Sequence, residues 1–280
     1  MTVDPNAFLF PPGAVPHTRF TAKHGFIMAT VNRAIRNGAT SLQILEVGSW
    51  LGASTLLWSE SIRHFGGAEI AGNSRVLAVD SWNPVLSSDD LMFEEYQEFA
   101  KAAKNDLAYN IFQHNAKLGT KLFGVKIDSI RGMSEDILPD IAPESCDIAY
   151  VDGSHYYDDV VYDIRLVKPI VKAGGTICGD DLNLKMEQVD AEVAMANGNR
   201  DCIVDEKTGL WYHPGVTRAV HESFPDVGAL GGFWTVTKMS DDIFVPNEVR
   251  FDGIFVPSFL DRDDKVFFCD TINQYVKPRP

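Results

Sequence analysis

The sequence predicts an α/β fold in which helices cover both faces of a mostly parallel sheet, and three observations support this. Short apolar runs typical of buried strands alternate with segments whose apolar residues recur at helical spacing. Several of these runs end in an acidic residue or a glycine, as strands do at a ligand-binding edge. The length of 280 residues suits one elaborated core. We therefore expect one domain with insertions and an extension.

The first half of the chain alternates helices and strands. The first helix stops at Gly38, a residue suited to a helix C-terminus. The expected elements are a helix over 24–38, a strand over 42–47, a helix over 53–66, a strand over 75–80, a helix over 108–119 and a strand over 123–132. Residues 83–109 are polar, acidic and longer than a connection requires, so we expect an added element over the crevice.

The second half continues this alternation and then changes character. The expected elements are strands over 146–151 and 175–180 with a helix between them, an inserted helix within 184–200, a helix over 215–224 and a strand over 231–238. Beyond Ser240 the chain is rich in aromatic residues and short apolar pairs, with Pro and Asp-Gly suited to small hairpins. This tail is expected to cover the site or a partner subunit.

Charge and composition exclude several classes of partner. With 39 acidic and 25 basic residues the net charge is −14, and no Lys/Arg cluster is present that would follow a phosphate backbone. Nucleic acid and anionic membranes are therefore not expected as partners. The N-terminus lacks a basic start, and no run of about 18 apolar residues occurs, so a soluble cytoplasmic protein is expected. The four cysteines are scattered without a CxxC pair, which favours reduced thiols.

Acidic residues follow two of the expected strands. Asp152 and His155 follow the strand over 146–151, and Asp180 and Asp181 follow the strand over 175–180. Carboxylates gathered at one sheet edge repel one another by about 4 kcal/mol per close pair at an effective dielectric of 20. A hard divalent cation such as Mg2+ relieves this repulsion and takes oxygen ligands. The sequence therefore indicates metal-assisted chemistry on an oxygen.

Each of these residues also has a structural interpretation. His155 could cap the next helix or bond to a backbone carbonyl. Neighbouring strand residues point to opposite faces, so Asp180 and Asp181 can both bind a cation only if the chain has left the strand by Asp181. Asp158, Asp159 and Asp163 are assigned to the solvated first turns of a helix, where acidic residues favour the helix dipole.

The segment EVGSWLGAS joins the first strand to a helix. Gly48 permits a tight turn, Gly52 permits close approach of a ligand, and the helix start offers free N–H groups. A dinucleotide fingerprint would read GxGxxG, whereas this chain has GxxxG, so a ligand without pyrophosphate is favoured. Glu46 can accept a hydrogen bond from an amine, and Asp80 can accept both hydroxyls of a ribose. A loop-capping role for Asp80 is the alternative.

Six segments in this order carry a resemblance to a known family: ILEVGSWLGAS, VLAVDSW, YNIFQHNAKLG, RGMSEDILP, DIAYVDGSHYYDDVVYDI and KAGGTICGDDL. Over about residues 20 to 240 the chain resembles the class I S-adenosylmethionine-dependent methyltransferases. It is most similar to the branch of macrolide-sugar and rhamnosyl O-methyltransferases, which shares its metal-site layout with catechol O-methyltransferases. The resemblance implies a three-layer Rossmann-like fold, with a mostly parallel sheet and an antiparallel last strand.

The resemblance also implies a domain layout. Residues 1–240 form the methyltransferase domain, with insertions near 83–109 and 184–212. Residues 241–280 form a C-terminal extension packed on the domain or on a partner subunit, and a homo-oligomer is possible. The insertion near 184–212 and the tail have no counterpart in the family.

The resemblance assigns roles to individual residues. His155 is the expected base, and Asp152 acts beside it. The expected metal ligands are Asp152, Asp180 and Asp181. The expected cofactor-binding residues are Glu46, Gly48, Ser49, Gly52, Ser54, Asp80, Ser81, Ser134 and Asp152. For Ser134, near the adenine, capping the next helix is an equal alternative.

The implied activity is transfer of a methyl group from S-adenosylmethionine to a hydroxyl of a small molecule, with Mg2+ or another divalent cation. A glycosylated natural product is favoured over a catechol. Coordination to a cation lowers the pKa of a hydroxyl, which makes it a better nucleophile. Trp211, Tyr212 and His213 are the preferred candidates for a substrate wall. The alternatives are a cephalosporin-hydroxylase-like protein, a nucleotide-binding scaffold and, least favoured without GxG, a dehydrogenase.

Overall fold

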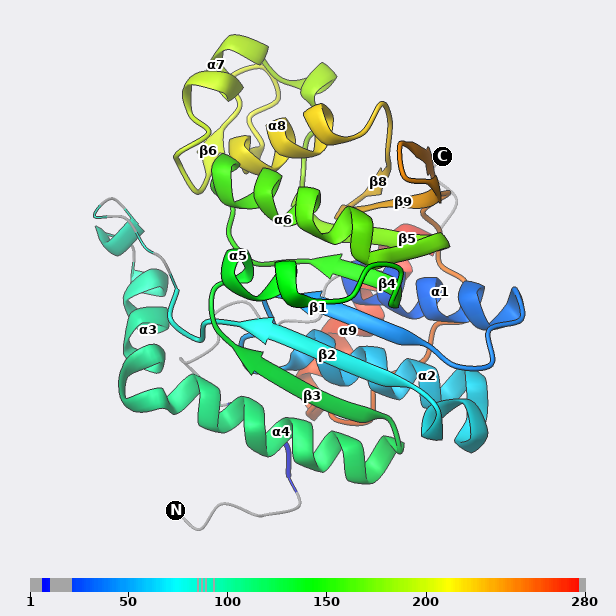
Figure 1. Ribbon diagram of the computed structural model, residues 1–280. Coiled ribbons are helices and arrows are strands. Elements are labelled where there is room, and N and C mark those ends of the chain that lie inside the picture. The colour runs from blue at the N-terminus through cyan, green and yellow to red at the C-terminus, as the bar shows by residue number, and fades with distance from the viewer. Residues whose placement is uncertain are drawn as a thin grey trace.

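A single mixed sheet forms the centre of the molecule. The computed structural model describes residues 7–10, 22–84, 86, 88, 90–92 and 94–276. The main path of the sheet runs β10-β9-β5-β4-β1-β2-β3, and β8 pairs with β9 (Figure 1). Strands β1 to β5 are parallel, whereas β9 is antiparallel to β5 and β10 to β9. The strands are β1 (Gln43–Val47), β2 (Arg75–Asp80), β3 (Lys126–Arg131), β4 (Cys146–Val151), β5 (Val171–Leu182), β8 (Gly228–Leu230), β9 (Gly232–Ser240) and β10 (Ile243–Pro246).

Helices cover both faces of this sheet. On one face lie α1 (Ala22–Arg36), α2 (Ala53–Gly72), α4 (Leu107–Phe123) and α9 (Arg262–Val276), and on the other α5 (Ser134–Ile137), α6 (Tyr157–Ile170) and α8 (Pro214–Ser223) (Figure 1). Strand β4 shows why both faces are apolar. Its Ile148 and Tyr150 pack under α1 and α2, while the alternate residues Ala149 and Val151 pack under α6 and α8. The predicted three-layer fold with a parallel sheet is confirmed.

The insertions lie at the carboxyl edge of the sheet. Within 83–109 the structure has α3 (Glu94–Ala103) between two short 3-10 turns, while residues 85, 87, 89 and 93 lie outside the described part. Within 184–212 the expected helix is short, α7 (Ala191–Ala196), and a small two-stranded sheet of β6 (Ile203–Val204) and β7 (Trp211–Tyr212) follows it.

The tail differs from the sequence prediction. Within the described part of the tail, up to residue 276, one hairpin forms, between β9 and β10, and the chain then forms the helix α9. Asp261 starts this helix, because its carboxylate accepts a hydrogen bond from the backbone N–H of Asp264. Phe268 and Ile272, one turn apart, enter the core beneath α1. The apolar residues after Asp261 recur at helical spacing, so this part of the tail forms a helix although Pro and Asp-Gly before it favour turns.

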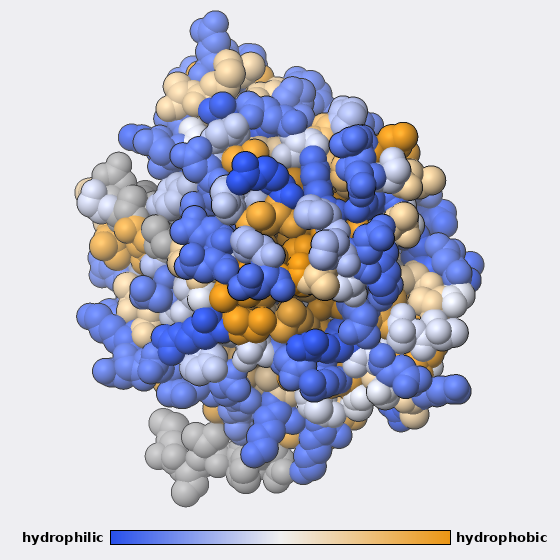
Figure 2. Space-filling view, in the orientation of Figure 1, coloured by the Kyte–Doolittle hydropathy of each residue, from blue (hydrophilic) through white to orange (hydrophobic). Residues whose placement is uncertain are grey.

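The face of the molecule shown in Figure 2 is largely hydrophilic. Figure 2 shows apolar side chains gathered in the middle of one face, over the junction of α5, α6 and β2, with hydrophilic side chains around them. Among the described helices, none has the length and apolar character needed to cross a membrane.

Candidate active site

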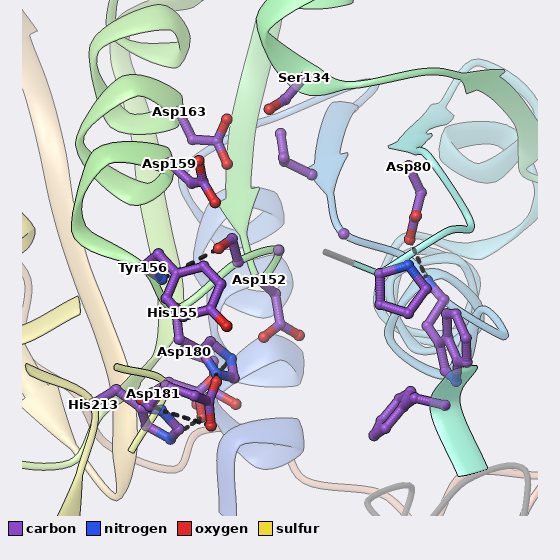
Figure 3. A pocket seen from close by; sticks show the side chains of 18 of the residues that line it. Asp80, Ser134, Asp152, His155, Tyr156, Asp159, Asp163, Asp180, Asp181 and His213 are labelled. Carbon is purple, nitrogen blue, oxygen red and sulfur yellow. Dashed lines mark hydrogen bonds and ion pairs between the residues drawn. The ribbon is translucent and has the colours of Figure 1, made fainter. Parts of the chain in front are cut away.

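A large cavity opens where β1, β2, β4 and β5 end. Its volume of about 1680 Å³ exceeds the roughly 300–1,000 Å³ of common small-ligand pockets. The strand ends line one part of it, and Tyr96 and Phe99 of the first insertion line another. Asp80 lies on one wall, and Asp152 and Asp180 lie across the space from it (Figure 3). The cavity is large enough for a nucleoside and a second molecule together.

The three predicted metal ligands meet at this cavity. Each of Asp152, Asp180 and Asp181 offers a carboxylate oxygen, and these oxygens lie within 4.8 Å of one another. Adjacent residues can face the same space because the strand is irregular between Gly179 and Leu182, and Asp181 has a φ of 65°. A non-glycine residue in this left-handed region is uncommon, and such irregularities often redirect a side chain at a functional site.

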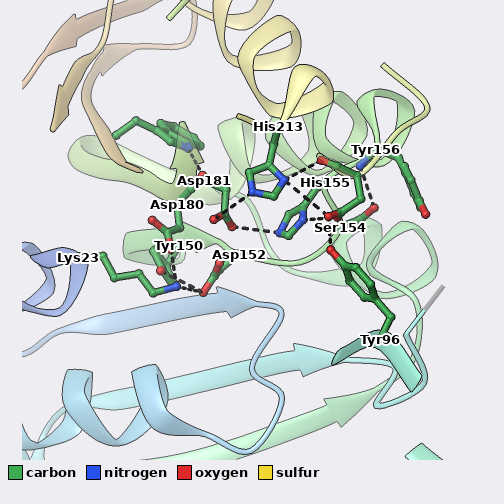
Figure 4. A network of polar contacts seen from close by, with 12 residues as sticks. Lys23, Tyr96, Tyr150, Asp152, Ser154, His155, Tyr156, Asp180, Asp181 and His213 are labelled. Carbon is green, nitrogen blue, oxygen red and sulfur yellow. Dashed lines mark hydrogen bonds and ion pairs between the residues drawn. The ribbon is translucent and has the colours of Figure 1, made fainter. Parts of the chain in front are cut away.

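A lysine that sequence reasoning missed lies among these carboxylates. The Nζ of Lys23, in the first turn of α1, forms an ion pair with Asp180 and lies 3.7 Å from Oδ2 of Asp152 (Figure 4). Tyr150 donates its hydroxyl to the same Asp152 oxygen, at 3.1 Å. Lys23 therefore supplies positive charge where the sequence predicted a cation.

The protonation of this cluster follows from burial and mutual charge. Burial raises the pKa of Asp152 to about 7, although the charge of Lys23 acts in the opposite direction. Burial also raises the pKa of Asp180. Burial by itself would raise the pKa of Asp181, but the charge and hydrogen bond of His155 bring it below the usual range. For Lys23, burial favours the neutral form, yet Asp152 and Asp180 raise its pKa overall.

Two histidines adjoin Asp181. The Nε2 of His155 lies 3.0 Å from Oδ2 of Asp181, and its Nδ1 lies 2.5 Å from Oδ1 of Asp201 (Figure 4). Carboxylates only accept hydrogen bonds, so both ring nitrogens carry protons in this arrangement. Although burial opposes it, Asp181 raises the pKa of His155 well above its usual value. The ring of His213 lies 4.2 Å from that of His155, between centroids.

The turn after β1 is held against β2 and β4. Gly48 has a φ of 84°, and a Cβ placed there would lie 2.1 Å from the carbonyl oxygen of Asp152, so no side chain fits. The backbone N–H groups of Ser49 and Trp50 both donate to Oδ2 of Asp80, at 2.8 Å, and that of Trp82 donates to Oδ1 at 2.6 Å. A carboxylate has about four acceptor positions. Asp80 therefore retains about one position for a ligand rather than the two expected for a ribose.

Residues 45–182 match the model of a family described as a methyltransferase domain. The segment from β1 to β5 therefore matches a methyltransferase domain. Among solved structures, the O-methyltransferase NovP aligns over 78% of this chain and 80% of its own, with 16% identity and a TM-score of 0.52. Two further structures are similar over much of their length. The first is the O-methyltransferase from Bacillus cereus in complex with SAH. The alignment covers 83% of this chain and 84% of the other, at 16% identity and a TM-score of 0.43.

The second similar structure is that of CalS11, a TDP-rhamnose 3'-O-methyltransferase of calicheamicin biosynthesis. The alignment covers 77% of this chain and 79% of the other, at 11% identity and a TM-score of 0.42. At such identities the NovP alignment shows a shared fold. No curated protein matches the chain in sequence.

Most of the predicted residues of the methyltransferase domain line the cavity. The predicted residues that do so are Gly48, Ser49, Ser54, Asp80, Ser81, Ser134, Asp152, His155, Asp180 and Asp181. Glu46 and Gly52 do not. Glu46 is fully buried behind the turn, where its Oε2 accepts hydrogen bonds from the hydroxyls of Ser49 and Thr55. Its Oε1 has no hydrogen-bond partner among the described residues.

One sequence assignment on α6 is wrong. The sequence predicts Asp163 on the solvated first turns, but it is 4% exposed and lines the cavity near Ser134. Burial raises its pKa to about 7, with a hydrogen bond from Ser134 acting in the opposite direction. Ser134 itself is the first residue of α5 after the cap residue Met133, so it does not cap that helix.

The expected substrate wall is only partly formed. Trp211 and His213 line the cavity, whereas Tyr212 is buried beneath them. Lys23, Asp201 and Tyr96 were not predicted from the sequence. Lys23 and Asp201 lie outside the range that matches the domain family, and the isolated positions of all three give no pattern that would single them out.

Proposed function

We propose that this methyltransferase domain transfers a methyl group from S-adenosylmethionine to a hydroxyl of a small molecule, with the help of a divalent cation. One observation carries the proposal. The three carboxylates of Asp152, Asp180 and Asp181 converge on one wall of the cavity, across from the Asp80 turn (Figure 3). A nucleoside held at Asp80 and an oxygen held at the carboxylates would share one enclosed space.

The residues around the turn suit the proposed cofactor. The remaining acceptor position of Asp80 can receive a hydroxyl of the ribose, and Ser134 lies on the wall where the adenine would fit. Gly48 keeps the turn close to the end of β4. When bound, S-adenosylmethionine supplies a methyl group on a positively charged sulfur. Residues of the turn orient it, and correct orientation can contribute about 7–11 kcal/mol to lowering the barrier.

The donor set suits a hard divalent cation. All three candidate ligands are carboxylates, which Mg2+ prefers over nitrogen and sulfur. The ion pair of Lys23 with Asp180, and its approach to Asp152, support a cation at this position. A bound divalent ion supplies the charge that lowers the pKa of an acceptor hydroxyl. Asp152, Asp180 and Asp181 would hold it there.

His155 is the proposed proton acceptor. Asp201 fixes the ring through Nδ1, which leaves Nε2 directed at the carboxylates. Nε2 shares a proton with Asp181, so this proton has to leave before the ring can accept one from a hydroxyl. General base catalysis of this kind contributes typically about 10²–10⁴ in rate.

The cavity favours a substantial acceptor. Its volume exceeds that of common single-ligand pockets, and Trp50, Phe99 and Trp211 provide flat apolar surfaces on its walls. Trp211 is 61% exposed and is free to contact a bound molecule. A glycosylated natural product fits these features better than a catechol, which fills only a small part of the space.

Transfer of isotope label tests the proposal. Purified protein is incubated with S-adenosylmethionine deuterated in the methyl group and with separate panels of glycosides, their aglycones and catechols. Mass spectrometry is expected to find the label on a hydroxyl of a glycoside. Protein that binds S-adenosylhomocysteine but labels no hydroxyl in any panel would refute O-methyl transfer. Labelling of catechols alone would refute the glycoside preference.

A further inference from the structure

The two histidines beside Asp181 have the arrangement of metal ligands. The Nε2 atoms of His155 and His213 both face Asp181, at 3.0 Å from Oδ2 and 3.8 Å from Oδ1. Ligands at about 2.0–2.1 Å from a tetrahedral ion lie about 3.4 Å from one another. The two observed separations, one to each oxygen of Asp181, bracket that value. The centroids of the two rings lie 4.2 Å apart, so one ion could reach all three groups after the side chains shift.

The other ring nitrogens are also bonded as in metal sites. Histidines that bind a metal usually donate their second N–H to a carboxylate or a backbone carbonyl, which fixes the ring. Nδ1 of His155 faces Oδ1 of Asp201 at 2.5 Å, and Nδ1 of His213 faces the backbone carbonyl of Asp201 at 2.7 Å. One residue thus supports both rings. A carbonyl can only accept, so Nδ1 of His213 carries a proton and Nε2 of the neutral ring has the free lone pair. Nε2 of His155 has to release its proton to bind a metal ion.

The side chain of Asp201 is itself held by a hydrogen bond. The hydroxyl of Tyr96, from α3 of the first insertion, donates to Oδ2 of Asp201. Asp201 comes from the second insertion, so this hydrogen bond joins the two insertions beside the histidines. The side chains of both histidines are largely buried, at 26% and 15% exposure. These contacts restrict the two rings to one orientation, and none of them involves Asp152 or Asp180.

We infer that His155, His213 and Asp181 form a binding site for a first-row transition metal ion such as Zn2+, Co2+ or Fe2+. Two imidazoles and one carboxylate suit such ions, whereas Mg2+ prefers oxygen alone. Asp181 belongs to both sites, so the nitrogen-containing site adjoins the proposed Mg2+ site. Binding of the transition metal does not depend on the proposed methyl transfer, because it needs neither cofactor nor acceptor.

One consequence does rest on the proposed function. Nε2 of His155 cannot bind a metal ion and accept a proton from an acceptor at the same time. Zn2+ in this site is therefore expected to inhibit Mg2+-supported methyl transfer. The His155 nitrogen thus links metal occupancy to catalytic activity.

Metal binding to chelator-treated protein tests the inference. Titration calorimetry compares Zn2+ and Mg2+ on the parent protein, His213→Gln, Asp201→Asn and Asp180→Asn, with the exposed His221→Gln of α8 as the matched control. Loss of a supporting residue typically weakens metal binding about 10–100-fold. His213→Gln and Asp201→Asn are expected to lose at least about 10-fold in Zn2+ affinity while Mg2+ affinity stays within about twofold. Asp180→Asn is expected to lose Mg2+ and keep Zn2+.

Spectra of the Co2+ form identify the ligands directly. Co2+ with nitrogen ligands and low coordination absorbs visible light much more strongly than Co2+ surrounded by six oxygens. The parent protein is expected to show the strong absorption and His213→Gln the weak one. Equal Zn2+ affinity in the parent and His213→Gln, or weak Co2+ absorption in the parent, would overturn the inference. Melting curves without metal establish that each variant is folded, and Asp201→Asn serves if His213→Gln is not.

Discussion

The ion pairs of Lys23 make a prediction about stability without metal. Nζ of Lys23 contacts Asp180 and lies 3.7 Å from Asp152. At an effective dielectric of 20, a pair at this separation is worth about 4.5 kcal/mol before desolvation. Removing one member of a buried pair costs about 3–5 kcal/mol, because the other charge stays buried. Since Lys23 is 22% exposed, we take the low end for Lys23→Met, about 3 kcal/mol.

This loss converts into a melting temperature. For large domains about 1 kcal/mol corresponds to about 2 °C, so Lys23→Met is expected to melt about 6 °C lower in chelator. Addition of Mg2+ should recover most of the difference, because a ligand at 100 times its dissociation constant adds about 2.7 kcal/mol. In the parent protein Mg2+ has to displace the ammonium, so its stabilisation should be smaller.

Thermal melting in chelator and in Mg2+ measures both effects. Lys172→Met is the matched control, because Lys172 pairs with Asp147 at 2.7 Å but is 41% exposed. Exposed pairs contribute only about 0–1 kcal/mol, so this variant should melt within about 2 °C of the parent. The reasoning is refuted if Lys23→Met melts like the parent in chelator, or if Mg2+ stabilises both proteins equally.

Two further predictions concern buried acids. The pKa of Asp163 is raised to about 7 in the folded protein, whereas in the unfolded protein the side chain releases its proton near pH 4. The neutral carboxyl group therefore contributes its full stabilisation of the folded state below pH 4, and this contribution is lost as the pH rises to about 7. Asp163→Asn should therefore raise the melting temperature at pH 8 and change it little at pH 4, and an equal change at both values would contradict this. Asp80→Asn should weaken S-adenosylhomocysteine about 10-fold or more in calorimetry, because a hydrogen bond to a charged group contributes about 1.5–3 kcal/mol; unchanged affinity would place the nucleoside elsewhere.

Local sequence patterns predict the parts of the site that belong to single elements. Strands β1 and β4 are largely buried and read as short, mainly apolar runs, and the second half of β5 is also buried. The ends of β4 and β5, with Asp152 and Asp180, can therefore be placed from sequence. Asp163 could also have been placed. It shares its helical face with Val160, Ile164 and Val167, all of which are buried, so the spacing itself marks a buried acid.

Other parts of the site depend on how distant elements pack. Lys23 reaches the carboxylates only because α1 docks beside the ends of β4 and β5, and no local pattern encodes that docking. Asp201 lies between two short elements of an insertion, where periodicity is absent. Asp180 and Asp181 face the same space only because the end of the strand is irregular. Gly179 allows such an irregularity, but the sequence does not show that it occurs.

The dependence of methyl transfer on Mg2+ tests the central claim most directly. Chelator-treated protein, deuterated S-adenosylmethionine and an acceptor found in the label-transfer panels are combined, and the rate is measured as Mg2+ is added. We expect almost no transfer without metal, full recovery with Mg2+ in the parent protein, and no recovery in Asp180→Asn. Undiminished transfer in chelator, or an Asp180→Asn variant that responds to Mg2+ like the parent, would contradict a cation held among these aspartates.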